Sequence, residues 1–94
     1  PFTQLDTLHR ESLYVLLDRF GIKGLSGADI EHMNKVWHRL DPWPDSVQGL
    51  TLLKTKYIIA PCSNGNVALI VNMAKRAGLP WDCVLGAEAT RAYK

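Results

Sequence analysis

Apolar residues recur every three or four positions through the first forty residues, which is the spacing of one face of a helix. Near the start, four of them follow the i, i+3, i+4, i+7 pattern: Leu13, Leu16, Leu17 and Phe20. Gly21 follows where a C-terminal cap is expected. The pattern predicts a first helix from about Leu5 to Phe20.

A second apolar stripe begins after the turn at residues 24–27. Ser26 and Asp29 have the spacing of a capping box, in which the two side chains bind the free amides at a helix start. The apolar residues that follow keep the helical spacing: Ile30, Met33, Trp37 and Leu40. We therefore expect a second helix that packs on the first as a helical hairpin.

The run Asp41-Pro42-Trp43-Pro44-Asp45 ends this helical region, because two prolines so close together cannot lie inside a helix. Beyond it the pattern alternates between helix and strand. It predicts helices at 45–54 and 66–77 and strands at 57–60 and 83–85. Such alternation is typical of an α/β fold with parallel strands and a crossover helix. We expect one unit at residues 1–41 and another at 42–94.

The helix expected at 66–77 has clear signals at its end. Gly78 suits a C-terminal cap, and Pro80 prevents continuation. A right-handed crossover through this helix brings the ends of both strands to the same edge of the sheet, where ligands bind in open α/β folds. The loop at 63–66 and the segment at 86–94 are therefore expected to lie together at that edge.

The chemistry of this loop suits an anion. Ser63 and Asn64 offer a hydroxyl and a carboxamide beside amides at the start of the next helix, and Lys94 adds a positive charge. The predicted ligand is a carboxylate, a phosphate or a halide. Ser, Asn and Gly at this place are also what a plain helix cap requires, so local chemistry leaves both interpretations open.

Composition narrows the class of protein. With 47% hydrophobic and 21% charged residues and a net charge of +2 over 94 residues, the chain is expected to be globular, without affinity for nucleic acid or membrane. The cytoplasm is the expected location. Cys62 and Cys83 form no metal or redox motif and are expected to be buried thiols, and the three histidines show no ligand spacing. Because the chain starts at Pro1, we expect a fragment of a longer protein.

Three stretches, "HRLDPWPDSVQGL", "YIIAPCSNGNVALIVNMAKRAGLPWDCVL" and "GAEATRAYK", resemble the central part of a type II (S)-2-haloacid dehalogenase of the haloacid dehalogenase superfamily. The similarity covers about residues 28–94 and rests on several motifs in the family's order. It implies that residues 1–41 are part of a helical cap domain. Residues 42–94 would then be part of a Rossmann-like core.

The resemblance also implies roles for three residues. Ser63 matches the second-motif serine, which bonds the nucleophilic aspartate or the substrate carboxylate. Asn64 matches an asparagine that binds the substrate and the departing halide, and Lys94 matches the third-motif lysine. The implied reaction converts (S)-2-haloalkanoic acids to (R)-2-hydroxy acids and halide through an aspartyl ester. It needs no metal and no cofactor.

The sequence also departs from the family pattern. No first-motif aspartate and no fourth-motif acidic residue occurs within residues 1–94, so we expect the isolated segment to be inactive. Missing strands would leave sheet edges and apolar faces uncovered, which predicts association, for example as a homodimer. Two alternatives remain open: a fragment of a phosphatase of the same superfamily, and a non-catalytic α/β module with an anion-binding loop.

Overall fold

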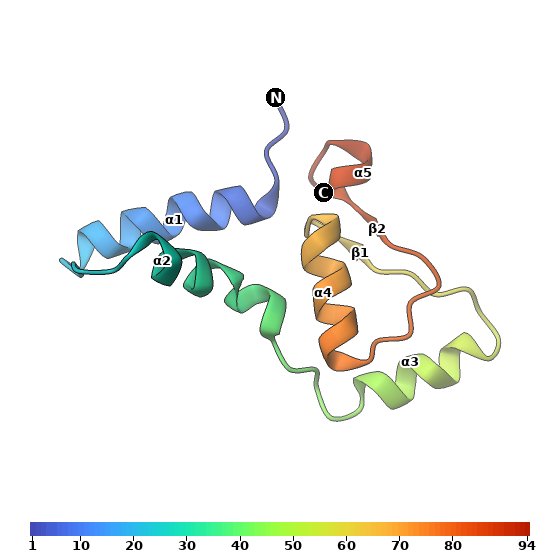
Figure 1. Cartoon of the computed structure of the whole chain (residues 1–94). Coiled ribbons are helices and arrows are strands. Elements are labelled where there is room, and N and C mark those ends of the chain that lie inside the picture. The colour runs from blue at the N-terminus through green and yellow to red at the C-terminus, as the bar shows by residue number, and fades with distance from the viewer.

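The computed structural model describes all residues, 1–94, and contains helices and one small parallel sheet (Figure 1). The elements, in chain order, are α1 (Leu5–Arg19), α2 (Gly27–Asn34), the 3-10 helix η1 (Lys35–Arg39), α3 (Ser46–Lys54), β1 (Cys62–Ser63), α4 (Val67–Ala77), β2 (Leu85–Gly86) and α5 (Ala87–Thr90). The predicted α/β class, a partial Rossmann-like layer with a helical part, is confirmed.

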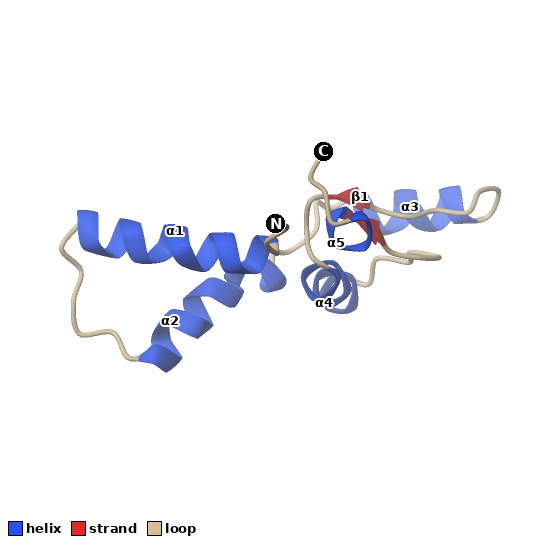
Figure 2. Ribbon diagram, turned by 90° about the horizontal axis from the view of Figure 1, so that it is seen from above, coloured by secondary structure: helices blue, strands red, loops and turns tan.

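Helices α1 and α2 lie side by side, as expected for a hairpin (Figures 1 and 2). The predicted capping box is present: the amide of Asp29 donates to the Ser26 hydroxyl at 3.1 Å, and the amide of Ser26 donates to the Asp29 carboxylate at 2.9 Å. The α-helix ends earlier than expected, at Asn34, and the chain continues as η1. A 3-10 segment of this kind is common at the end of an α-helix.

The predicted apolar stripe of the first helix is only partly buried. Leu17 is buried, whereas Leu16 and Phe20 are 49% and 69% exposed. The reason is that α2 is short and leaves an open hollow between α1, α2 and η1. Leu16 borders this hollow together with Met33 and Trp37.

Helix α4 agrees closely with the prediction. Gly78 takes the left-handed conformation, with φ of 76°, and its amide bonds the carbonyl of Ala74. Leu69 and Ile70 are buried, and α4 packs against η1. This helix is thus a major contact between the helical pair and the rest of the chain.

The two strands pair in parallel, but the first lies later in the chain than predicted, and the second, Leu85–Gly86, overlaps its predicted range only at Leu85. β1 is Cys62–Ser63, paired with β2 so that Cys62 lies opposite Leu85 and Ser63 opposite Gly86. The apolar run at 57–60 is not a strand. There the Ile59 amide donates to the Asp82 carboxylate at 2.8 Å, and the Asp82 amide donates to the Ile59 carbonyl at 2.9 Å. A side chain therefore takes the backbone bond that a neighbouring strand would supply.

The core is thin for a chain of this length. Nine of 94 residues are buried, and the radius of gyration is 15.8 Å, against about 12 Å for a compact domain of this size. Ile58 and Trp43 are more than three-quarters exposed, in line with the expected uncovered apolar faces. Cys62 and Cys83, expected to be buried, are exposed free thiols because neither lies beneath a second layer. No helix has the length and hydropathy needed to cross a membrane.

Candidate functional site

The loop at residues 63–66 connects β1 to α4, at the carboxyl edge of the sheet where the sequence places it. The amide of Gly65 donates to the Ser63 hydroxyl oxygen at 3.0 Å. This bond uses one lone pair of the hydroxyl and leaves its hydrogen free for another acceptor. Ser63 can therefore serve as a hydrogen-bond donor to a ligand.

Asn64 and Lys94 lie together although they are thirty residues apart. The backbone amide of Lys94 donates to the Asn64 carboxamide oxygen at 3.0 Å, and the Lys94 ammonium donates to the Cys62 carbonyl at 3.2 Å. The carboxamide oxygen is thus fixed, and the NH₂ group is its free end. The ammonium retains two more N–H donors.

The predicted site residues Ser63, Asn64 and Lys94 thus belong to one cluster of donors. Beside it lies a hollow of about 420 Å³, which both Ser63 and Lys94 line. Its other lining residues come from the two strands and from the segment after β2: Cys62, Leu85, Gly86, Ala87, Ala89, Thr90, Ala92 and Tyr93. A hydroxyl and an ammonium donor at one hollow, with the Asn64 carboxamide bound to the adjoining backbone, favour an anionic ligand.

Gly86 makes the close pairing of this edge possible. A Cβ atom on Gly86 would lie 2.9 Å from the Ser63 carbonyl oxygen and 3.1 Å from that of Gly65. Both contacts are to backbone, which cannot move without opening the strand pair. The absence of a side chain is therefore what allows β2 to lie directly against the loop.

The start of α4 differs from the expectation. The Val67 amide, the first of the helix, donates to the Glu88 carboxylate, which also accepts from the Gln4 side chain at 2.8 Å. A protein carboxylate thus occupies the place at the helix start that was predicted for a bound anion. The donors for a ligand are the side chains of the loop and Lys94.

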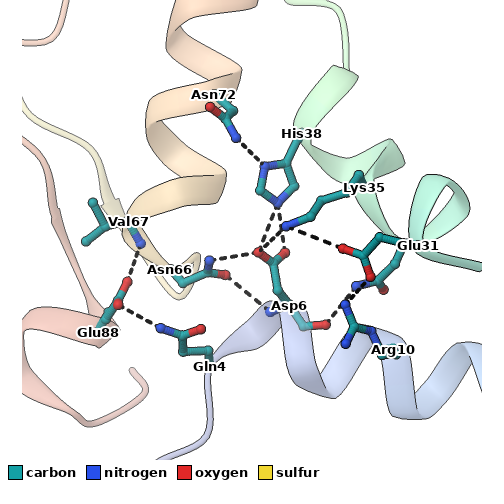
Figure 3. A network of polar contacts seen from close by, with 11 residues as sticks. Gln4, Asp6, Arg10, Glu31, Lys35, His38, Asn66, Val67, Asn72 and Glu88 are labelled. Atoms are coloured by element: carbon teal, nitrogen blue, oxygen red, sulfur yellow. Dashed lines mark hydrogen bonds and ion pairs between the residues drawn. The ribbon is translucent and has the colours of Figure 1, made fainter. Parts of the chain in front are cut away.

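A second polar cluster lies at the other end of the loop (Figure 3). Asn66 is 3% exposed, and its NH₂ group donates to the Asp6 carboxylate at 2.8 Å while its oxygen accepts from the Asp6 amide at 3.2 Å. His38, 5% exposed, approaches the two oxygens of the same carboxylate at 2.9 and 3.0 Å through Nε2. Asn72 approaches its Nδ1 at 2.9 Å.

The cluster lowers the pKa of Asp6. Partial burial alone would raise that pKa, but the hydrogen bonds from Asn66 and His38 and the positive charges of His38 and Lys35 outweigh this effect. These residues were not predicted from the sequence. They are up to sixty positions apart, and no local pattern joins Asp6 to Asn66 or to His38.

No group of three or more His, Cys, Asp or Glu side chains in the chain is arranged to hold a metal ion.

Solved structures share the fold of this chain over nearly its whole length. The defluorinating L-2-haloacid dehalogenase Rha0230 matches 99% of it at 47% identity with a TM-score of 0.95, and the L-2-haloacid dehalogenase PA0810 matches 100% of it at 46% identity with a TM-score of 0.96. A Xanthobacter autotrophicus L-2-haloacid dehalogenase with chloropropionic acid covalently bound matches 99% at 27% identity and a TM-score of 0.87. The resemblance to the haloacid dehalogenases is confirmed.

The chain matches only part of each of these dehalogenases. The chain spans 39%, 41% and 38% of the lengths of the three dehalogenase structures. No protein-family model and no curated protein matches the sequence. The likeness to the dehalogenases therefore rests on the structures and on the identity over residues 1–94.

Proposed function

We propose that this chain is the central segment of a hydrolytic (S)-2-haloacid dehalogenase. The observation that carries the proposal is the 47% identity to such an enzyme over 99% of the chain, together with the same fold. The gathering of Ser63, Asn64 and Lys94 on one edge supports it. The proposed substrate is a small 2-haloalkanoic acid, and the products are the (R)-2-hydroxy acid and halide.

In the proposed reaction an aspartate from outside residues 1–94 attacks C2 of the substrate. The new C–O bond forms as the carbon–halogen bond breaks, and halide leaves with the bonding electrons. Water then hydrolyses the ester, which releases the hydroxy acid and restores the carboxylate. No metal and no cofactor takes part.

The three site residues would reduce the repulsion between two anions. The attacking carboxylate and the substrate carboxylate are both negative, so their approach needs positive charge and hydrogen-bond donors. Lys94 would offset the charge of the aspartate. Ser63 would bind one of the carboxylates, and the NH₂ group of Asn64 would bind substrate and the departing halide.

We further propose that residues 1–41 are part of a cap domain, residues 42–94 part of the core, and the cytoplasm the place of action. The exposed apolar side chains of α1 support association with a second copy. They are Tyr14, Val15, Leu16 and Phe20. Sedimentation equilibrium tests the proposed homodimer, and a monomeric mass at micromolar concentration would contradict it.

A chimera tests the proposed activity. In it, these 94 residues replace the matching segment of the PA0810 enzyme, with which they share 46% identity. We expect the chimera to release chloride from (S)-2-chloropropionate. Lys94→Met or Ser63→Ala should lower kcat/KM by about 100-fold or more, since each removes a donor to the developing charge.

Lys75→Met is the matched control, because Lys75 is an exposed lysine on α4 away from the loop. It should leave kcat/KM within about twofold, as surface substitutions usually do. A folded chimera without dehalogenase activity would contradict the proposal. Hydrolysis of a phosphate monoester in its place would favour the phosphatase alternative.

A further inference from the structure

Asn66 lies at the N-cap position of α4, yet its side chain makes no bond to the helix. It faces Asp6 on α1, with which it exchanges two hydrogen bonds of 2.8 and 3.2 Å. One runs from the Asn66 amide group to the carboxylate and the other from the Asp6 backbone to the Asn66 oxygen. Two bonds in opposite directions fix both the position and the rotation of the carboxamide.

Asp6 is itself held from other elements. His38 on η1 contacts both of its carboxylate oxygens, and Lys35, also on η1, lies 3.7 Å from one of them. His38 is in turn contacted by Asn72 on α4, six residues after Asn66 and thus about 9 Å further along the helix. The contacts close a ring through α1, η1 and α4 (Figure 3).

A second link joins the same elements beside the ring. Gln4, just before α1, donates to Glu88 on α5, and Glu88 accepts from the first amide of α4. The start of α1 is therefore tied to the start of α4 twice, once through each carboxylate. The residues Ser63 to Asn66 lie directly before that helix start.

From this ring we propose that Asp6 and His38 are positioning residues for the loop of Ser63 and Asn64. They hold Asn66, and through Asn66 they set where the loop lies relative to the helical pair. The two donors are then in place only when α1 and η1 are docked on α4. This coupling goes beyond the proposed dehalogenase activity, because it concerns the loop whatever ligand the loop binds.

The test measures amide hydrogen exchange in this chain by NMR. The reporters are the Gly65 amide, which bonds the Ser63 hydroxyl, and the Lys94 amide, which bonds the Asn64 oxygen. Amides in the middle of α4 are the internal reference. We expect Asp6→Ala to speed exchange at both reporters by about tenfold or more relative to that reference.

Asp29→Ala is the matched control, since it breaks the capping box of α2 far from the loop. It should leave the reporters within about twofold of the reference. Exchange that rises equally at the reporters and through α4 would overturn the proposal, because the ring would then serve stability alone.

Exchanging the two side chains of the Asp6–Asn66 pair provides a second test of the proposal. Asn66→Asp alone places two carboxylates face to face and should speed exchange at Gly65. Asp6→Asn combined with Asn66→Asp restores an amide–carboxylate bond in the other direction and should return the rate to within about threefold of the wild type. Failure of the double variant to recover, with α4 intact, would also contradict the proposal. None of these readouts depends on enzyme activity, so a failed dehalogenase assay leaves them independent.

Discussion

The two ends of the loop between β1 and α4 contrast sharply. At the outer end, Asn64 has its oxygen bound and its NH₂ group free, and Ser63 retains a hydroxyl hydrogen. At the inner end, both polar atoms of the Asn66 side chain have partners and the residue is almost wholly buried. Two asparagines two positions apart therefore have opposite tasks: one can bind a ligand, and the other binds the protein.

Burial explains the difference. A buried polar group without a partner costs free energy, so the inner end must be fully paired for the helices to dock. At the partly exposed outer end, the free donors can bind water until a ligand replaces that water. Free donors in a fixed loop thus indicate binding, and saturated donors indicate positioning.

The strongest test of this difference between the two ends is to replace each asparagine in turn. Asn66→Ala removes two hydrogen bonds and leaves part of the partly buried Asp6 without partners, so it should lower the free energy of unfolding by about 2 to 3 kcal/mol. Asn64→Ala should change it by less than about 0.5 kcal/mol. Urea denaturation followed by circular dichroism compares the two, and equal losses would remove the distinction.

A methyl group at Gly86 tests how tightly the outer end is packed. Gly86→Ala brings a Cβ within 2.9 Å of the Ser63 carbonyl and should cost about 1 to 3 kcal/mol. Gly49→Ala is the control: a Cβ there meets nothing within 4 Å inside α3, and alanine should stabilise the helix by up to about 1 kcal/mol. Thermal unfolding of both variants measures the difference, and a neutral Gly86→Ala would show that the loop can shift.

Acid should weaken the inner end, because its hydrogen bonds depend on the charged carboxylate of Asp6. The pKa of Asp6 is lowered below 3.8, so its stabilising contribution is fully present above that value and is lost as the pH falls through the lowered pKa of the folded chain. Stability measured from pH 6 to pH 2 should therefore fall less steeply in Asp6→Asn than in the wild type. Parallel curves for the two proteins would show that the ring does not stabilise the charged carboxylate.

The smallest expected effect belongs to Lys94. Its ammonium bonds only the Cys62 carbonyl at a largely exposed position, so Lys94→Met should change the free energy of unfolding by less than about 0.5 kcal/mol. The same substitution should strongly lower activity in the chimera. A large loss of stability would move Lys94 from the binding end to the structural one.

Local signals were sufficient for most of the helices. The hydrophobic spacing and the left-handed Gly78 place α1 and α4 to within a few residues, and the capping box at Ser26 places the start of α2. The end of α2 was predicted too late, because the chain changes to the 3-10 helix η1 after Asn34. The first strand was misplaced because strand formation depends on the partner. The apolar run at Ile59 is bound by Asp82, and only the short stretch opposite β2 forms the ladder.

For the candidate site, too, some residues could be predicted from the sequence and others could not. Ser63, Asn64 and Lys94 could be proposed from loop chemistry and family motifs, and the structure brings them together. The ring of Asp6, His38 and Asn66 could not be proposed, since it joins three elements through tertiary contacts alone. The bond from the first amide of α4 to Glu88 could not be proposed either, because it also depends on a tertiary contact.

The elongated outline of the chain affects how its size would be measured. The molecule extends 51 Å in one direction and 18 Å in another, and its radius of gyration of 15.8 Å is that of a compact protein of about 180 residues. In gel filtration a single copy should elute nearly where a globular pair of such chains would. Light scattering on the eluting peak, which reports mass independently of shape, separates one elongated chain from two.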